Sequence, residues 1–189
     1  MPIIIGVLGE KRSGKGAFAK LLRDIVKPIT VARIGASEIL SKTLEIWEIE
    51  KSRKNFQKLA VVMDKGFGKG TVTNAVWQRI LADPSEIVIF DGVRWQSDLE
   101  KIRTFERNYI VYVTAGTEIR WRRSLELTEK TGENTATFEE FMNEEKMETE
   151  KYIPELGAKA DFKIVNEGTL DDFRNEVRKF VTLYFSRSR

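Results

Sequence analysis

The chain contains 189 residues with a net charge of +3, and 41% of its residues are hydrophobic while 32% are charged. These proportions exclude a disordered chain and are typical of one compact domain that folds alone. Cysteine and histidine are both absent, which excludes disulfides, thiolate catalysis, cysteine-ligated zinc and histidine acid–base chemistry. Any reaction must therefore use Lys, Arg, Asp, Glu, hydroxyl groups and the backbone.

Basic and acidic residues are interleaved over most of the chain, whereas a nucleic-acid binder would gather Lys and Arg on one face. This pattern argues against a nucleic-acid partner and favours a small anionic ligand. The apolar run at residues 2–8 is too short for a secretory segment, and no run approaches the roughly 18 apolar residues of a membrane span. We therefore expect a cytoplasmic protein that does not bind a membrane.

Short runs of β-branched and aromatic residues predict the strands. In chain order they lie at residues 3–8, 29–34, 87–90, 109–113 and 162–165, and the second run is the weakest. Segments with helical apolar spacing separate them. This alternation predicts a five-stranded parallel sheet with helices on both faces, an α/β fold of three layers in one domain, residues 1–189.

Two connections are longer than a minimal crossover between parallel strands. Residues 36–83 contain enough helical sequence for about three segments. Residues 117–153 contain another long helical stretch, which "TGENTAT" interrupts. We expect both segments to add helices to the sheet domain.

A glycine-rich loop follows the first predicted strand and fits the pattern G-x-x-x-x-G-K. Glycines allow backbone N–H groups to turn inward around phosphate oxygens, and the lysine can reach the β- and γ-phosphates. A plain turn with a solvated lysine is the structural alternative. The residues expected to bind the phosphates are Gly9, Lys11, Arg12, Ser13, Gly14, Lys15, Gly16 and Ala17.

Gly16 stands where many such loops place a Ser or Thr that holds Mg²⁺. In this respect the loop resembles that of the nucleoside monophosphate kinases, whose adenylate kinase branch carries Gly-Lys-Gly here. The resemblance implies that magnesium is held largely through water. The sequence departs from the adenylate kinases at Ala17, where they usually have Thr.

An aspartate follows the predicted strand at residues 87–90. The segment "DGVR" places Asp91 at the carboxyl end of a central strand, and Gly92 and Arg94 follow it. Asp91 can orient hydrated Mg²⁺ or the attacking phosphate, and the planar guanidinium of Arg94 suits a monophosphate. A turn that caps the next helix is the structural alternative. The segment resembles the Asp-Gly-x-Arg segment of archaeal adenylate-kinase-like proteins and of phage-type deoxynucleoside monophosphate kinases.

The resemblance to these kinases extends through "SRKNFQKLAVVMDKGFGKGTV". It implies an acceptor-binding insertion at about residues 36–83, in which Arg53, Gln57 and Lys65 are candidates for contact with the acceptor's phosphate or base. Each of them is also consistent with an exposed helical position. Ser37 is a further candidate for acceptor binding, although a helix cap is its favoured role.

Arg120 and Arg123 lie three residues apart, which places both guanidiniums on one side of a helix. The same spacing occurs in the lids of nucleotide kinases and implies a lid at about residues 117–153 that closes over the transferring phosphates. A helix with a solvated basic face is the structural alternative. Asn166, after the last strand, is a candidate for the adenine pocket or a residue of a plain turn.

These motifs together predict a P-loop NTPase fold and an enzyme that transfers the γ-phosphoryl group of ATP to a nucleoside or deoxynucleoside monophosphate. The expected cofactors are ATP and Mg²⁺, with Asp91 holding the metal through water, and the protein is expected to be a monomer or homodimer. A dephospho-coenzyme A kinase, with Asp91 or another acid as base, and a regulatory ATPase are the alternatives. The residues expected to act in catalysis are Lys15, Asp91, Arg94, Arg120 and Arg123.

Overall fold

The computed structural model describes residues 2–126, 137–147 and 150–185. Its centre is a five-stranded sheet in the order β2-β3-β1-β4-β5, in which each neighbouring pair of strands is parallel. The predicted α/β fold is therefore confirmed. The strands are β1 (Ile3–Leu8), β2 (Val31–Gly35), β3 (Ile87–Asp91), β4 (Asn108–Thr114) and β5 (Phe162–Val165).

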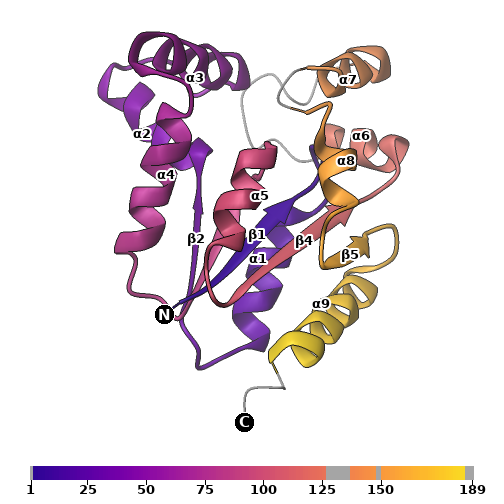
Figure 1. Ribbon diagram of the computed structural model, residues 1–189. Coiled ribbons are helices and arrows are strands. Elements are labelled where there is room, and N and C mark those ends of the chain that lie inside the picture. Colours follow the sequence, from indigo (N-terminus) through magenta and orange to yellow (C-terminus); the bar gives the residue numbers. More distant parts are fainter. Residues whose placement is uncertain (1, 127–136, 148–149, 186–189) are drawn as a thin grey trace.

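Helices cover both faces of this sheet, so the predicted three layers are confirmed (Figure 1). On one face, α1 (Lys15–Ile25) and α9 (Leu170–Phe185) pack Phe18, Leu22 and Phe180 against the central strands. The opposite face is covered by α4 (Thr71–Ala82), α5 (Gln96–Arg103) and α8 (Ile153–Gly157). β1 is buried on both faces, because apolar residues of adjacent positions join opposite clusters.

The insertion between β2 and β3 forms three helices, as the sequence predicted: α2 (Ala36–Ile46), α3 (Arg53–Phe67) and α4. Leu40 and Leu44 of α2 meet Phe56 and Leu59 of α3 in a small separate core. The apolar stripes of α2 and α3 therefore stabilise this insertion largely by packing on each other.

The second long connection follows β4 and contains α6 (Thr117–Glu126) and α7 (Phe138–Glu145). Residues 127–136 of the predicted lid, which include most of "TGENTAT", lie outside the described residues. In the part of the chain that is described, no helix has both the length and the apolar character needed to cross a bilayer.

The register of the sheet brings the motif residues to one edge. Val7 of β1 lies beside Asp91 of β3, and Leu8 lies beside Tyr112 of β4. In Figure 1, β1 and β2 point toward the end of the molecule where α2, α3, α6 and α7 lie. Loops at the carboxyl ends of parallel strands are where α/β proteins bind ligands.

Candidate active site

The glycine-rich loop joins β1 to α1, and two of its glycines are required by the backbone. Gly9 has φ +156° and Gly14, which precedes the first turn of α1, has φ +112°. A Cβ on Gly9 would lie 2.1 Å from the carbonyl oxygen of Val113, and one on Gly14 would lie 2.3 Å from Nδ2 of Asn166. These positions therefore exclude larger residues, and the first turn of α1 presents its N–H groups beside the loop.

Lys15 is half-buried, and its Nζ donates hydrogen bonds to the carbonyl oxygens of Gly9 at 2.7 Å and Glu10 at 2.8 Å. Burial, followed by the positive charge of Arg94, lowers the pKa of Lys15 from 10.5 to about 8. The negative charges of Asp91, Glu150 and Glu10 oppose this shift. Lys15 is thus oriented by its own loop and lies within electrostatic range of both predicted acceptor-side residues.

Other predicted loop residues have distinct surroundings. Ser13 is fully buried, and its Oγ has no hydrogen-bond partner among the described residues. Arg12 has a positive φ of 62°, which places this residue in the left-handed region within the loop's turn. Ala17 packs against the core beneath α1, so its side chain supports the loop from the apolar side.

Asp91 ends β3 and forms an ion pair that the sequence did not predict. Nε and Nη2 of Arg33, on the neighbouring strand β2, donate to the same Asp91 oxygen, Oδ2, at 2.9 and 2.5 Å. The other oxygen, Oδ1, is buried and has no hydrogen-bond partner in the described part of the chain. One sequence feature could have identified Arg33 as a site residue. It lies near the carboxyl end of the weakest predicted strand.

Arg94 follows Gly92, which has φ +88° and turns the chain out of β3. Its guanidinium Nη1 is paired with Oε2 of Glu150, a carboxylate that is only 7% exposed. Its backbone N–H donates to Asp98 Oδ2 at 2.9 Å, and burial raises the pKa of that carboxyl. Asp98 thus fixes the turn, while the charged end of Arg94 reaches toward Lys15 and Glu150.

Arg120 of α6 is almost fully buried. Its Nε donates to the carbonyl oxygen of Ala115 at 2.7 Å, and its Nη2 donates to Thr117 Oγ1 at 3.0 Å. Both Nη atoms bond the carboxylate of Glu145, at the end of α7. Lys11 of the loop makes a similar contact, since its Nζ lies 2.9 Å from Oε2 of Glu144.

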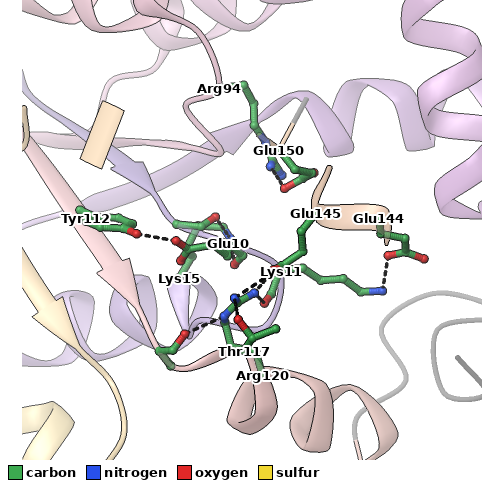
Figure 2. Close-up of polar contacts among 12 residues, drawn as sticks. Glu10, Lys11, Lys15, Arg94, Tyr112, Thr117, Arg120, Glu144, Glu145 and Glu150 are labelled. Atoms are coloured by element: carbon green, nitrogen blue, oxygen red, sulfur yellow. Dashed lines mark hydrogen bonds and ion pairs between the residues drawn. The ribbon is translucent and has the colours of Figure 1, made fainter. Parts of the chain in front are cut away.

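Three glutamates from one short stretch therefore hold three of the predicted phosphate-binding cations (Figure 2). We call Glu144, Glu145 and Glu150 the glutamate triplet. The sequence did not predict the triplet, because an acidic run beside an apolar stripe has the pattern of a solvated helix face. Its one signal is the density of acidic residues after Phe141.

Phe141 anchors α7 between two of these cations. Its side chain is fully buried, with Lys11 Nζ at 5.3 Å and the Arg120 guanidinium at 5.8 Å from the ring centroid. Cation–π attraction adds to the two ion pairs. The end of α7 is thereby fixed directly over the glycine-rich loop.

Arg123 and Asn166 form a second link to the loop. Arg123 Nη2 donates to the Asn166 carbonyl oxygen at 2.9 Å, and Asn166 Nδ2 donates to the Ser13 carbonyl oxygen at 2.8 Å. Arg123 therefore points toward the loop after β5, whereas Arg120 points toward α7. Arg123 Nη1 is buried without a hydrogen-bond partner among the described residues, so it retains a donor beside the loop.

The candidate acceptor-binding residues on the insertion differ from one another in their surroundings. Ser37 is exposed within α2, whose N-cap is Gly35, so the favoured prediction that Ser37 caps the helix was wrong. The chain passes from β2 directly into α2 at Gly35. Gln57 of α3 contacts Met147, with 3.7 Å between Nε2 and Sδ, while Lys65 is exposed. Arg53 begins α3.

Side-chain ligands for a metal ion are sparse at this site. The described residues contain no group of three or more acidic side chains that could hold one. Gly16 offers no side-chain oxygen, and Asp91 Oδ2 is already bonded to Arg33. These residues do not form a Mg²⁺ site made of protein side chains alone, because Asp91 Oδ1 is the one Asp91 oxygen left without a partner among the described residues. Indirect holding by Asp91 through water stays a prediction.

A scan against protein-family models finds none that matches this chain. Among curated proteins, the chain is 28% identical over 179 residues to a UPF0200 protein of Sulfurisphaera tokodaii, covering 94% of this chain and 95% of that protein. It is also 28% identical over 183 residues to a UPF0200 protein of Hyperthermus butylicus, covering 95% of this chain and 94% of that protein. The similarity thus extends over nearly the full length of both relatives.

Among solved structures, the chain resembles shikimate kinase from Bacteroides thetaiotaomicron with a TM-score of 0.62 and 14% identity, covering 96% of this chain and 97% of that one. TT1252 from Thermus thermophilus gives a TM-score of 0.60 with 17% identity, covering 97% and 98%. At these identities the likeness shows the fold alone. The resemblance to P-loop kinases that the motifs predicted is confirmed at that level.

Proposed function

We propose that this protein is an ATP-dependent phosphotransferase that moves the γ-phosphoryl group of ATP to a nucleoside or deoxynucleoside monophosphate. The observation that supports this proposal most directly is the cluster of Lys11, Lys15, Arg94 and Arg120 at the carboxyl edge of the sheet (Figure 2). Four cations around one glycine-rich loop suit a ligand set with several phosphates. The fold that positions these four side chains is that of the P-loop kinases.

In this proposal the loop amides and Lys15 hold the β- and γ-phosphates of ATP. Arg94 follows β3 and binds the acceptor phosphate as a planar fork. Arg120 and Arg123 flank the loop from α6 and stabilise the charge on the transferring group. Mg²⁺ would enter as part of the MgATP substrate and neutralise phosphate charge there.

The pairing of Asp91 favours an acceptor that is already anionic. A hydroxyl acceptor requires a base, and Arg33 holds one of the two Asp91 oxygens through two hydrogen bonds. A phosphate acceptor requires no base, because it is itself the nucleophile. Asp91 would then orient the reacting groups rather than remove a proton.

A kinase of a hydroxyl acceptor, such as dephospho-coenzyme A, is the second candidate. The buried Asp91 Oδ1, which has no partner among the described residues, is the observation in its favour, since it is an acceptor placed near Lys15. A regulatory ATPase is the third possibility, and its ATP turnover would need no small acceptor.

An ATP-consumption screen over nucleoside monophosphates, deoxynucleoside monophosphates and dephospho-coenzyme A tests these functions. We expect rapid ADP formation only in the presence of one class of monophosphate, together with formation of the matching diphosphate. Stimulation by dephospho-coenzyme A alone would select the second candidate. Turnover that no acceptor changes would overturn the kinase proposal, and Lys15→Ala controls for contaminating activity.

A further inference from the structure

Gly16 replaces the usual loop hydroxyl, and a guanidinium lies beside it. A Cβ built on Gly16 would lie 3.6 Å from Nη1 and 3.7 Å from Nη2 of Arg33, an ordinary van der Waals separation. Alternation along β2 explains the approach. Val31 packs on the face that α1 covers, and Arg33, two residues later, points to the same face. Arg33 thus lies over the first turn of α1.

The hydrogen bonds of Arg33 leave part of its guanidinium available for an anion. Nε and Nη2 bond Asp91, and Nη1 lies toward Gly16 without a hydrogen bond to any described residue. The Arg33 side chain is 43% exposed, while that of Asp91 is 15% exposed. Asp91 therefore positions Arg33 through its Nε and Nη2 atoms, and the edge of the guanidinium formed by Nη1 and Nη2 lies beside Gly16 of the loop.

The Arg33 guanidinium lies beside the position from which a P-loop hydroxyl would otherwise direct a metal ion to the β- and γ-phosphates. The described residues supply no such hydroxyl at position 16, and the metal-ligand set is poor. A guanidinium carries a permanent positive charge and two parallel donors that match a phosphate. The guanidinium of Arg33 can therefore supply part of the positive charge that a metal ion held at position 16 would supply.

We propose that Arg33 is an ATP-binding residue that contacts a terminal phosphate directly, in place of a metal ion held by a side chain at position 16. The inference rests on the proposed ATP site and adds a residue to it. Asp91 is then a positioning residue for Arg33. The consequence is that ATP binding by this protein depends little on Mg²⁺.

The test is direct binding of ATP to the full chain, once with excess Mg²⁺ and once with EDTA. For the unaltered protein we expect dissociation constants within about tenfold of each other in the two conditions. For Arg33→Ala we expect a loss of about 10- to 100-fold in EDTA and a clearly smaller loss with Mg²⁺, from the energy of one charge-assisted contact. Binding of AMP, which lacks the β- and γ-phosphates, should be affected least.

Two controls separate this role from a structural one. Arg79→Ala removes another arginine near β2, which pairs with Glu38, and should leave ATP binding unchanged in both conditions. Arg33→Gln keeps most of the side-chain volume and two hydrogen-bonding groups, and its melting temperature shows whether the fold is retained. A folded Arg33→Gln variant should lose ATP binding in EDTA as Arg33→Ala does.

Three results would overturn the inference. If folded Arg33 variants bind ATP normally in EDTA, Arg33 serves Asp91 alone. If they bind ATP normally but require more acceptor for half-maximal rate, Arg33 belongs to the acceptor site. If the unaltered protein binds ATP in neither condition, the proposed function fails as well, and the unaltered protein alone reveals that outcome.

Discussion

The glycine-rich loop and the glutamate triplet hold charged side chains in opposite ways. Lys15 is held by backbone carbonyls of its own loop, five and six residues away in sequence, between a central strand and the helix that follows it. Glu145 and Glu150 reach Arg120 and Arg94 across 25 and 56 residues, from α7 and the chain beyond it. The loop's geometry is therefore local, whereas the triplet's contacts depend on where α7 packs.

This difference indicates which interactions a ligand can replace. Breaking the loop would disturb β1 and α1, which form part of the main core. Breaking the triplet's ion pairs would expose cations that a phosphate can hold equally well. We therefore interpret the loop as a fixed cradle and the triplet as carboxylates that hold Lys11, Arg94 and Arg120, the cations that we propose bind phosphate, until a nucleotide binds.

The largest effect should come from the loop. We expect Lys15→Ala to keep the fold and to lower the phosphoryl-transfer rate at least about 100-fold, from the loss of about 3 kcal/mol of electrostatic stabilisation. Steady-state turnover with the acceptor found by screening measures it. Lys20→Ala, an exposed position on the same helix, should turn over normally. Unchanged turnover in Lys15→Ala would remove the fixed cradle from the mechanism.

The next effect should distinguish the acceptor side from the ATP side. We expect Arg94→Ala to raise the acceptor KM about 30-fold while the ATP dissociation constant changes less than about threefold, because one charge-assisted contact to the acceptor is lost. Acceptor kinetics and ATP titration measure the two quantities. Lys101→Ala, on exposed surface of α5, is the matched control. Equal losses of acceptor affinity and ATP affinity would mean that Arg94 contacts both substrates or supports the fold.

A smaller effect should follow from the pKa of Lys15. That pKa is about 8 in the free protein, so the ammonium form, which binds phosphate, declines as pH rises through this value. ATP binding should therefore weaken about eightfold between about pH 7.5 and about pH 9 and change little below that range. Binding should also take up protons, which calorimetry in two buffers detects. Lys15→Arg should flatten the profile, and a slope that survives in it would assign the titration elsewhere.

The sequence predicted the local features of this site well and its long-range pairs poorly. Residues 3–8 and 162–165 form strands with the predicted bounds, and Asp91 ends β3, because short β-branched and aromatic runs and their order along the chain determine these features. Arg33 was missed because its meaning depends on pairing with Asp91 across two strands that are distant in sequence.

Two further outcomes show the same limit. The favoured cap at Ser37 failed because Gly35 passes from extended strand directly into α2, which shifts the helix start ahead of Ser37. Arg120 and Arg123 share a side of α6 by spacing, but one pairs with α7 and the other with the loop after β5. Periodicity gives the direction of a side chain and not its tertiary partner.

The smallest effect should come from the triplet itself. Replacing Glu144, Glu145 and Glu150 by Gln removes the carboxylates that compete with phosphate for Lys11, Arg120 and Arg94. We expect about fivefold tighter ATP binding, since partly exposed ion pairs contribute roughly 1 kcal/mol or less. We also expect a lower melting temperature without nucleotide, because the buried guanidinium of Arg120 loses its carboxylate partner. Glu139→Gln, exposed on the same helix, should change neither quantity.

Tryptophan emission can report release of the triplet in the unaltered protein. Trp121 packs on Phe138 of α7 with 5.3 Å between ring centroids, and Trp95 lies 6.3 Å from Tyr152, so the two indoles contact residues that precede and follow the triplet in the chain. ATP with acceptor should change their emission, and most of that change should vanish in a Trp95→Phe, Trp121→Phe variant. If the triple Gln variant instead binds ATP more weakly, the glutamates support the nucleotide site. If neither ATP nor acceptor changes the tryptophan emission, α7 does not move during turnover. The ion pairs of the glutamate triplet are then a permanent part of the fold and are not replaced by phosphate.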